Sequence, residues 1–194
     1  KKICKSIWFM RQAGRYLPEF RKIRSKNKNF INLCLNSELS SEITLQPIKK
    51  FNLDSAIIFS DILIVPFALG QEVRFIAGKS PKLSNFVTRD FFNNNEKEFT
   101  RKLKPVYKAI KITRQKLDKN KSLISFIGAP WTLLTYMFNL NRQKIHQNLL
   151  ELDKNKNLDH ILEVLIKYLN LHIKNQVDAG ADVVQIFDSW AGLI

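Results

Sequence analysis

Apolar residues recur along this 194-residue chain at two spacings, and each spacing predicts a different kind of element. Three short runs are apolar at nearly every position, and they are Ser55–Phe59, Leu123–Ile127 and Asp182–Phe187. A strand with one face in water alternates apolar and polar residues, whereas these runs do not alternate. They therefore predict strands that are buried on both faces.

Elsewhere apolar residues return every three or four positions, which is the repeat of an amphipathic helix. The clearest case runs from Leu158 to Val177. Gly180 follows at the point where a left-handed residue would end such a helix. A shorter pattern from about Lys104 to Leu117 predicts a second helix. Pro105 would then lie in its first turn, where proline is tolerated.

A third helix is predicted over Ser37–Phe51, with Ser37 as its N-cap. Pro47 falls inside this pattern. Proline removes a backbone hydrogen bond and clashes with the preceding turn, so we expect a kink or an early end there. Residues 70–90 contain Gly70, Gly78 and Pro81, and we expect a loop with a little irregular strand.

The alternation of helices with all-apolar strands predicts βα units and a parallel sheet. At roughly 150 residues per domain, and with no low-complexity linker, the chain should form one fold. Polar or small residues directly follow each strand: Asp61, then Gly128–Pro130, then Asp188 and Ser189. The carboxyl ends of parallel strands converge on the ligand site, so this placement favours an enzyme.

The chain is strongly basic, with 32 Lys and Arg against 17 Asp and Glu and a formal net charge of +15. Three explanations fit this charge: a surface filled with lysine by compositional bias, a nucleic-acid partner, or a polyanionic small substrate. Charge alone does not choose among them. The hydrophobic fraction of 45% does exclude a disordered chain, because it is ample for a packed core.

Membrane insertion and disulfide bonding are both disfavoured by the sequence. The longest apolar run, Ile62–Leu69, is far shorter than the roughly 20 residues that span a bilayer, and it contains Pro66. Cys4 and Cys34 have neither pair spacing nor neighbouring histidines, so we expect no disulfide framework and no zinc site. This cysteine usage fits a reducing, cytoplasmic setting.

Four ordered stretches carry a resemblance to a known family. They are WFMRQAGRYLPEFR at 8–21, IFSDIL at 58–63, GAPWTLLTYM at 128–137 and QIFDSWAG at 185–192. The chain thereby resembles the uroporphyrinogen decarboxylase family of haem biosynthesis from about Ile7 to its last residue. The resemblance implies an α/β fold, a (β/α)8 TIM barrel, of which residues 1–194 would be the N-terminal part of a single domain.

The resemblance covers roughly the first half of such a barrel. The chain also begins without methionine and stops just after a strand, so we expect it to be part of a longer protein. The family's substrate-binding histidine and the strands that close the barrel would lie beyond Ile194. We therefore expect residues 1–194 alone to be inactive, with parallel strand edges left exposed.

The resemblance implies that Arg11, Gln12, Ala13, Gly14 and Arg15 bind the acetate and propionate groups of a tetrapyrrole. Arginine suits this role, because its planar guanidinium holds carboxylates in a bidentate fashion, and glycine lets the backbone approach a ligand. Without the resemblance, two arginines four residues apart would be read as a surface pair.

Asp61 is implied to be the catalytic residue at the centre of the site. The four pyrrole N–H groups of a porphyrinogen can converge on one carboxylate. A pyrrole protonated on carbon is a cation that accepts the electrons released with carbon dioxide, and a pre-placed carboxylate stabilises that charge. This chemistry requires no cofactor and no metal. The alternative for an isolated Ser-Asp after a strand is a helix N-cap.

The resemblance also implies that Tyr136 and Ser189 contact the substrate. Alone, Tyr136 would be read as a core aromatic residue and Ser189 as a turn residue. His146, His160 and His172 lie on predicted helices outside every matched stretch, so we interpret them as structural or surface residues.

The activity implied is the removal of carbon dioxide from the four acetate side chains of uroporphyrinogen III, which gives coproporphyrinogen III. A homodimer is implied for the full-length enzyme, with no nucleic-acid or membrane partner. Two alternatives remain open. One is a corrinoid-dependent methyltransferase of the same barrel superfamily, whose zinc site would lie in the second half. The other is a basic nucleic-acid-binding module, which would need aromatic and basic residues on one face.

Overall fold

The computed structural model describes residues 9–76, 78, 80–140, 154 and 158–193. The chain divides into two compact units. Unit 1 comprises Lys1–Asp61, Lys104–Phe126 and Asn175–Gln185, and unit 2 comprises Ile62–Leu103, Ile127–Lys174 and Ile186–Ile194. Most unit boundaries fall inside a helix or a strand, so single elements contribute residues to both units.

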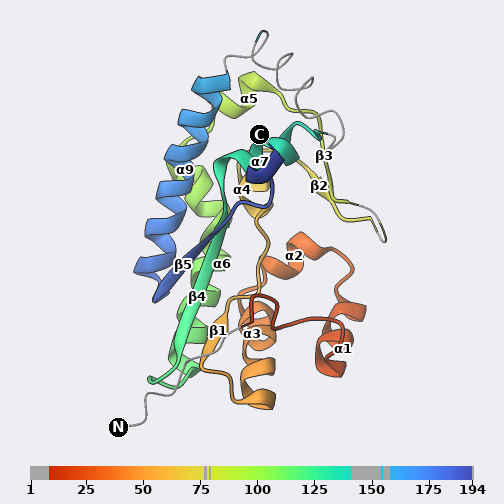
Figure 1. Cartoon of the computed structure of the whole chain (residues 1–194), viewed down its shortest axis with the longest axis vertical. Helices are drawn as coiled ribbons and strands as arrows, with labels where there is room; N and C mark the ends of the chain where they lie inside the picture. Colours follow the sequence, from red (N-terminus) through yellow and green to blue (C-terminus); the bar gives the residue numbers. More distant parts are fainter. Residues whose placement is uncertain (1–8, 77, 79, 141–153, 155–157, 194) are drawn as a thin grey trace. The chain divides into compact units, whose positions relative to one another are not determined.

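The described helices and strands follow one another along the chain as Figure 1 labels them. The helices are α1 (Pro18–Lys26), α2 (Phe30–Cys34), α3 (Ser37–Phe51), α4 (Ile64–Ala68), α5 (Thr88–Phe92), α6 (Glu96–Lys116), α7 (Pro130–Met137) and α9 (Leu158–Asp178). The strands are β1 (Ser55–Ile57), β2 (Val73–Arg74), β3 (Lys82–Leu83), β4 (Ser122–Gly128) and β5 (Val183–Phe187). A short 3-10 turn covers Ala191–Leu193.

The three predicted apolar strands form one sheet in the order β1-β4-β5. Strands β1 and β4 are parallel, with Ser55 opposite Ser122 and Ile57 opposite Ile124. Strand β5 runs the same way, because Asp182 donates to the Leu123 carbonyl and Ala129 donates to the Phe187 carbonyl. The predicted parallel sheet is thus confirmed.

Burial differs between the strands, and one expectation is wrong. Ala56, Ile57 and most of β4 are buried, as predicted. Strand β5 is not buried on both faces, because Val183 is 48% exposed and Ile186 is 52% exposed. It lies at the end of the sheet order, and the described residues provide no further strand beside it. An apolar edge strand of this kind needs a cover to bury its side chains.

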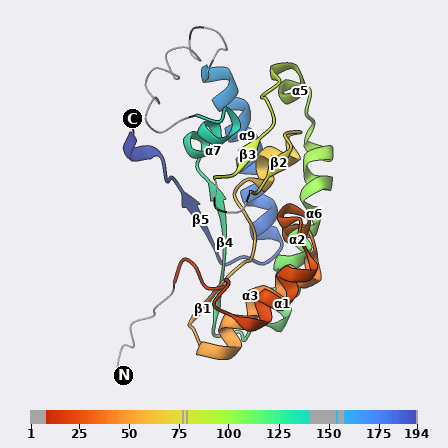
Figure 2. The same cartoon turned by 90° about the vertical axis from the view of Figure 1, so that its right-hand side faces the viewer.

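The core of unit 1 forms where the first three helices meet β1. Helix α3 packs against α1, α2 and β1, and Figures 1 and 2 show these elements side by side. Leu17, Phe20, Leu33 and Ile43 form a buried cluster, and Phe59 packs against it from the turn after β1. Leu17 is extended before Pro18, as expected for a residue that precedes proline.

Helix α3 has the predicted bounds, but its cap and its proline behave differently from the prediction. The N-cap is Asn36, whose side chain accepts a hydrogen bond from the Leu39 N–H at 3.0 Å. Ser37 instead donates to the Pro105 carbonyl at 2.8 Å. Pro47 is buried inside the helix, which continues to Phe51. Tertiary packing of the buried face therefore outweighs the lost hydrogen bond of one proline.

Helix α6 begins eight residues before the position that periodicity indicated, at Glu96 rather than about Lys104. Asn95 accepts a hydrogen bond from the Glu98 N–H at 2.8 Å and so caps the helix. Glu96 and Glu98 in the first turn complement the positive end of the helix dipole. Pro105 consequently lies in the helix interior rather than in its first turn, which corrects that expectation.

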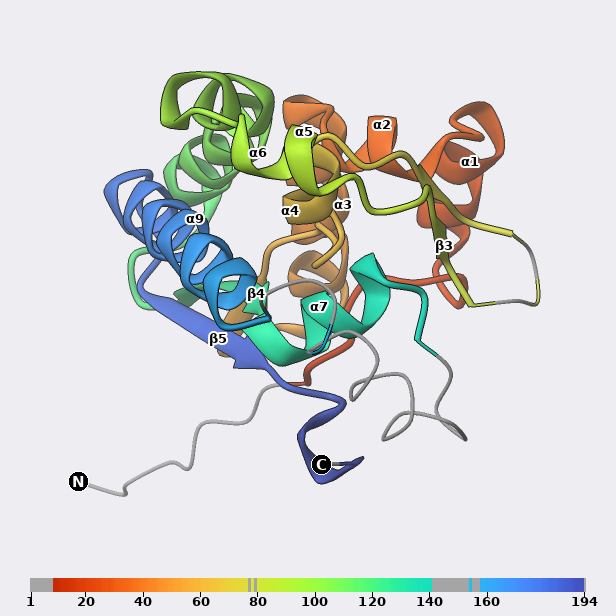
Figure 3. The same ribbon diagram turned by 90° about the horizontal axis from the view of Figure 1, so that it is seen from above.

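Helix α9 and the segments of unit 2 around it match the prediction closely. Gly180 follows α9 with a left-handed φ of 108°, as expected for a residue that ends the helix. The first turns of α6 lie beside α9, where the rings of Phe99 and Tyr168 are 4.9 Å apart between centroids (Figure 3). Residues 70–87 contain the short antiparallel pair β2–β3 within loop, as predicted, but the last three residues of the predicted loop belong to α5.

Two histidines of α9 support their interpretation as structural or surface residues. His160 is exposed, and His172 is buried within unit 2 with its ring 6.4 Å from that of Phe99. His146 lies outside the described residues. Burial lowers the pKa of His172 to about 3, so the imidazole is neutral in the folded protein at neutral pH.

This burial predicts a loss of stability in acid. The unfolded chain binds a proton at His172 below about pH 6.5, whereas the folded protein does not. The contribution of the neutral, buried His172 to the free energy of unfolding is therefore fully present above pH 6.5. It is lost as the pH falls toward 3, by at most about 1.4 kcal/mol per pH unit. Urea unfolding at pH 6.5 and pH 5.0 should show this loss, and His172→Leu should reduce it. An unchanged pH dependence in the variant would contradict the assignment.

Candidate active site

The segment that carries Arg11 and Arg15 is fixed to strand β1 by the residue between them. Gln12 is 2% exposed, and its Nε2 donates to the Ser55 carbonyl at 2.7 Å. Its Oε1 accepts from the Ile57 N–H at 3.1 Å. Both ends of the amide are thus engaged with β1, so the Gln12 side chain anchors the loop in this structure.

Further bonds give the loop a defined shape. The Tyr16 hydroxyl donates to the Gln12 carbonyl, and the Leu17 N–H donates to the Gly14 carbonyl at 3.0 Å. The Arg21 guanidinium donates to the Arg15 carbonyl at 2.7 Å. The side chains of Arg11 and Arg15 are exposed, and no hydrogen bond or ion pair among the described residues uses their guanidinium groups. Both groups are therefore available to anionic ligands.

Ala13 and Gly14 occupy different environments within the loop. Ala13 packs against the buried cluster of unit 1. Gly14 is half-buried and has no left-handed φ, and an added Cβ would come no closer than 3.5 Å to the Tyr16 ring. The described fold therefore does not itself require glycine at this position, which leaves the approach of a ligand as a reason for it.

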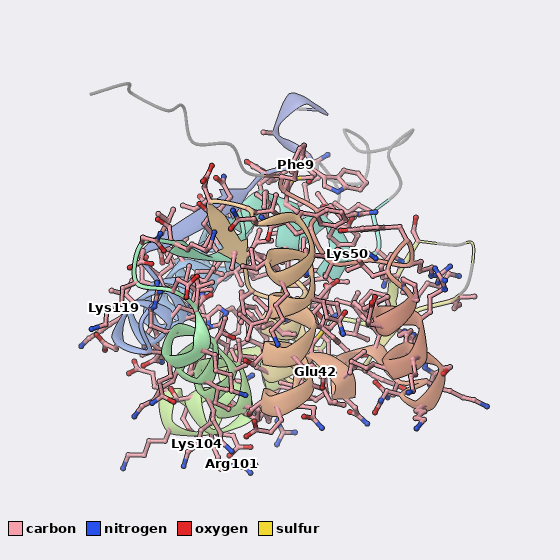
Figure 4. The ribbon with its side chains drawn as sticks, turned by 90° about the horizontal axis from the view of Figure 1, so that it is seen from below. Phe9, Glu42, Lys50, Arg101, Lys104 and Lys119 are labelled. Atoms are coloured by element: carbon pink, nitrogen blue, oxygen red, sulfur yellow. The ribbon has the colours of Figure 1, made fainter. Side chains whose placement is uncertain are left out.

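A pocket of about 280 Å³ lies beside the loop in unit 1. Its lining is largely aromatic and includes one guanidinium, and it consists of Phe9, Arg11, Gln12, Tyr16, Phe51 and Leu53. Phe9, which Figure 4 labels, is 59% exposed, and the rings of Tyr16 and Phe51 are 6.2 Å apart between centroids. The pocket combines apolar surface with a positive charge, so it suits an organic anion.

Asp61 lies in the turn after β1 and is half-buried. It is not a helix N-cap, because helix α4 has Leu63 at that position and no side-chain cap bond. The structure therefore removes the alternative interpretation of this aspartate. The pKa of the buried Cys34 thiol is raised well above its usual value. Burial is the largest cause, the negative charge of Asp61 raises this pKa further, and the charge of Arg24 lowers it.

Arg24 is a basic residue of this region that sequence reasoning missed. Its guanidinium lies 5.6 Å from the centre of the Phe30 ring and donates to the Lys28 carbonyl at 2.8 Å. The charge of Arg24 lowers the pKa of the Cys34 thiol, whereas the charge of Asp61 raises it. A single arginine on a helix has no spacing pattern, so the sequence offered no signal for it.

Unit 2 carries Tyr136 on α7 and Ser189 after β5. The Tyr136 ring packs edge-on against Trp190, with centroids 6.0 Å apart. Ser189 is exposed. Among the described residues, no hydrogen bond uses the hydroxyl of either side chain, so both hydroxyls can serve a ligand. Within unit 2, Tyr136 is half-buried rather than a fully buried core residue.

Thr132 fixes the residues on both sides of Ser189, and sequence reasoning missed it too. Its buried hydroxyl donates to Asp188 Oδ1 at 2.6 Å and accepts from the Trp190 N–H at 3.2 Å. The short turn that carries Ser189 is therefore tied to α7 within unit 2. A threonine inside an apolar helix pattern gives no hint of a partner 56 residues away.

A family model described as uroporphyrinogen decarboxylase (URO-D) matches residues 5–194. The chain belongs to the uroporphyrinogen decarboxylase family. The residues matched by the family model include the Arg11–Arg15 loop and Asp61, which belong to unit 1, and Tyr136 and Ser189, which belong to unit 2.

Curated relatives agree with this family. The chain is 45% identical over 196 residues to a uroporphyrinogen decarboxylase of Orientia tsutsugamushi (strain Ikeda), covering 97% of this chain and 55% of that protein. It is 43% identical over 190 residues to the uroporphyrinogen decarboxylase of Rickettsia felis, covering 97% of this chain and 55% of the relative. The chain therefore spans about half the length of the uroporphyrinogen decarboxylases that it matches.

A solved structure shows the same fold. A methyltransferase from Methanosarcina mazei superposes with a TM-score of 0.66 and 19% identity, over 81% of this chain and 47% of that chain. At this identity the similarity concerns the fold alone. Together with the parallel sheet and the family match, it assigns the chain to the α/β class and to about half of a (β/α)8 TIM barrel.

Three further observations concern metal binding, membrane insertion and cysteine pairing. Within the described part of the chain, no group of three or more His, Cys, Asp or Glu side chains could hold a metal ion. None of the described helices is long and apolar enough to cross a membrane. Cys34 is a free, buried thiol, and Cys4 lies outside the described residues.

Proposed function

We propose that residues 1–194 form the N-terminal part of a single barrel domain that decarboxylates the four acetate side chains of uroporphyrinogen III, giving coproporphyrinogen III. The family match, which runs through both units, supports one domain. One observation carries the proposal. The loop with the two exposed arginines is hydrogen-bonded to β1, the same strand that leads to Asp61.

The substrate is proposed to be held by charge. Uroporphyrinogen bears eight carboxylates, and Arg11 and Arg15 offer two planar groups that bind carboxylates in a bidentate fashion. Gly14 and Ala13 would let the backbone of the loop approach the substrate. Gln12 would contribute mainly through its anchoring of the loop, since its amide is bound to β1. Tyr136 and Ser189 would supply hydroxyl groups to the same substrate.

Asp61 is proposed to be the catalytic residue. A proton adds to a pyrrole carbon and makes the ring cationic. The bond between the acetate methylene and its carboxylate then breaks, and its electron pair moves into the ring while carbon dioxide leaves. A second proton converts the exocyclic methylene to methyl, and the ring loses the first proton. The Asp61 carboxylate would accept hydrogen bonds from the pyrrole N–H groups and stabilise the cation without reorganisation.

The remaining parts of the proposal concern the whole enzyme. The ring itself is the electron sink, so the reaction as proposed involves no cofactor. A homodimeric full-length enzyme in the cytoplasm, with no nucleic-acid or membrane partner, completes the proposal and rests on the family resemblance and on the cysteine usage. The similarity to a methyltransferase concerns the fold and gives no evidence about the reaction, so it does not favour the corrinoid-dependent alternative.

The proposal is tested by product analysis. The full-length enzyme, which is the longer protein that carries this sequence, is incubated anaerobically with uroporphyrinogen III and no added cofactor. Chromatography after oxidation should show porphyrins with seven, six, five and finally four carboxylates. Residues 1–194 alone should leave the substrate unchanged, because they span about half the length of their relatives. Unchanged uroporphyrinogen in both samples would refute the activity.

A further inference from the structure

In the part of the chain that the structure describes, side chains and no further strand bind the edge of β1 that faces away from β4. Ile58 donates its N–H to the Ile124 carbonyl, toward β4. Successive residues of a strand direct their backbone groups to opposite edges, so residues 55 and 57 of β1 face the other way. Gln12 binds the Ser55 carbonyl and the Ile57 N–H, and helix α3 binds both polar groups of Phe59.

Two buried hydroxyl groups of α3 form a closed ring of hydrogen bonds with Phe59. Thr44 Oγ1 accepts from the Phe59 N–H at 2.8 Å and donates to the Ser40 carbonyl at 2.7 Å. Ser40 Oγ donates to the Phe59 carbonyl at 2.5 Å. Ser40 is 1% exposed and Thr44 is 0% exposed. Each buried hydroxyl therefore satisfies one backbone group of the half-buried Phe59.

The side chain of Phe59 is held as firmly as its backbone. Its ring makes edge-on contacts with Phe20 on α1 and Phe30 on α2, each at 5.7 Å between centroids. On the same helix α3, Glu42 and Lys50 are exposed to solvent, as Figure 4 shows. The buried face of α3 thus serves to hold the turn that begins at Phe59.

We propose that Thr44, assisted by Ser40, is a positioning residue for Asp61. The inference rests on the proposed decarboxylase function and deepens it. Only one residue separates Phe59 from Asp61. The orientation of the Phe59 backbone therefore sets the position of the Asp61 backbone, from which the carboxylate extends. Electrostatic stabilisation of a cationic ring depends on a carboxylate that is already aimed when charge develops. Thr44 orients Asp61 by holding the Phe59 backbone and does not itself contact the substrate.

The variant that tests this role is Thr44→Val in the full-length enzyme. Valine keeps the shape of threonine but cannot accept a hydrogen bond from the Phe59 N–H, which then loses its partner on α3. A displacement of about 1 Å at a reacting group can cost about 100-fold in rate, so we expect kcat to fall about 10- to 100-fold. KM should change by less than about twofold, because the Arg11–Arg15 loop is held by Gln12 instead. Thr44→Ser keeps the hydroxyl and should restore most of kcat.

A matched control separates positioning from a general loss of stability. Thr113 is also 0% exposed, and within unit 1 its hydroxyl donates to the Ala109 carbonyl at 2.7 Å and shares a hydrogen bond with the Ser41 hydroxyl, 3.0 Å away, as its acceptor. It makes no contact with the Phe59 turn through that hydroxyl. Thr113→Val should lower Tm by a similar amount to Thr44→Val and should leave kcat unchanged.

Equal kcat values for Thr44→Val and Thr113→Val would overturn the positioning role, as would a Thr44→Ser variant no better than valine. A crystal structure of the Thr44→Val enzyme provides the second readout, which does not depend on turnover. The Asp61 carboxylate should be displaced relative to the unsubstituted enzyme, and an unmoved carboxylate would also overturn the role. A wild-type enzyme that leaves uroporphyrinogen unchanged would instead refute the proposed function, and only the displacement would then bear on Thr44.

Discussion

Asp61→Asn in the full-length enzyme is expected to lower kcat for uroporphyrinogen III by about 100- to 1000-fold, which is the usual cost of losing one pre-organised electrostatic group. Asparagine has almost the same shape as aspartate and can still accept a hydrogen bond from a pyrrole N–H. It lacks the negative charge that would stabilise the cationic ring. The loss should therefore appear in kcat more than in KM, since the ground-state substrate is neutral at its pyrroles.

Steady-state rates of coproporphyrinogen formation measure this effect. Asp118→Asn is a suitable control, because Asp118 is an exposed carboxylate of unit 1 that lies outside the four short stretches at 8–21, 58–63, 128–137 and 185–192. The control should retain wild-type kcat. An Asp61→Asn enzyme that decarboxylates at the normal rate would remove Asp61 from the mechanism.

The double variant Arg11→Ala/Arg15→Ala is expected to lower kcat/KM by about 100- to 10,000-fold, mainly through KM. A hydrogen bond to a charged group contributes about 1.5–3 kcal/mol, and each 1.4 kcal/mol corresponds to about tenfold in affinity. Two arginines that hold substrate carboxylates would contribute this amount each. The loop itself should stay in place, because Gln12 and the Tyr16 hydroxyl hold its backbone without either guanidinium.

The lysine variant Arg11→Lys/Arg15→Lys distinguishes bidentate binding from simple charge. It should recover only part of the loss, because lysine is a point charge without the planar fork of arginine. Arg101→Ala is the matched control, since Arg101 is an exposed arginine paired with Glu98 in unit 2. Full recovery with lysine would contradict bidentate binding, and a wild-type KM for the alanine variant would contradict any role in binding.

The features that the sequence predicted well are those with a strong local pattern. Strands β1 and β4 are continuous apolar runs, and both are buried in a parallel sheet. Helix α9 has seven apolar positions at helical spacing and a glycine, Gly180, that ends it. The stretch at 8–21 indicated the family, and the family model confirms that membership.

The features that the sequence did not predict depend on contacts between distant segments or on competing caps. Asn36 and Asn95 cap helices that hydrophobic spacing alone placed at Ser37 and near Lys104. The burial of β5 could not be foreseen, because an apolar run does not say whether a neighbouring strand is present. Thr44 and Thr132 each bind a turn far along the chain. The position of a threonine in a helix pattern does not indicate which residue its hydroxyl binds. The roles of Arg11, Arg15, Asp61, Tyr136 and Ser189 stay predictions.

The most direct test of the central claim is a crystal structure of the full-length enzyme with coproporphyrinogen III bound. We predict that one Asp61 carboxylate lies within hydrogen-bonding distance, about 2.7–3.2 Å, of the pyrrole nitrogens. The guanidinium groups of Arg11 and Arg15 should contact carboxylates of the same ligand. A tetrapyrrole bound elsewhere, or one whose pyrrole nitrogens face a different residue while Asp61 stays distant, would contradict the account.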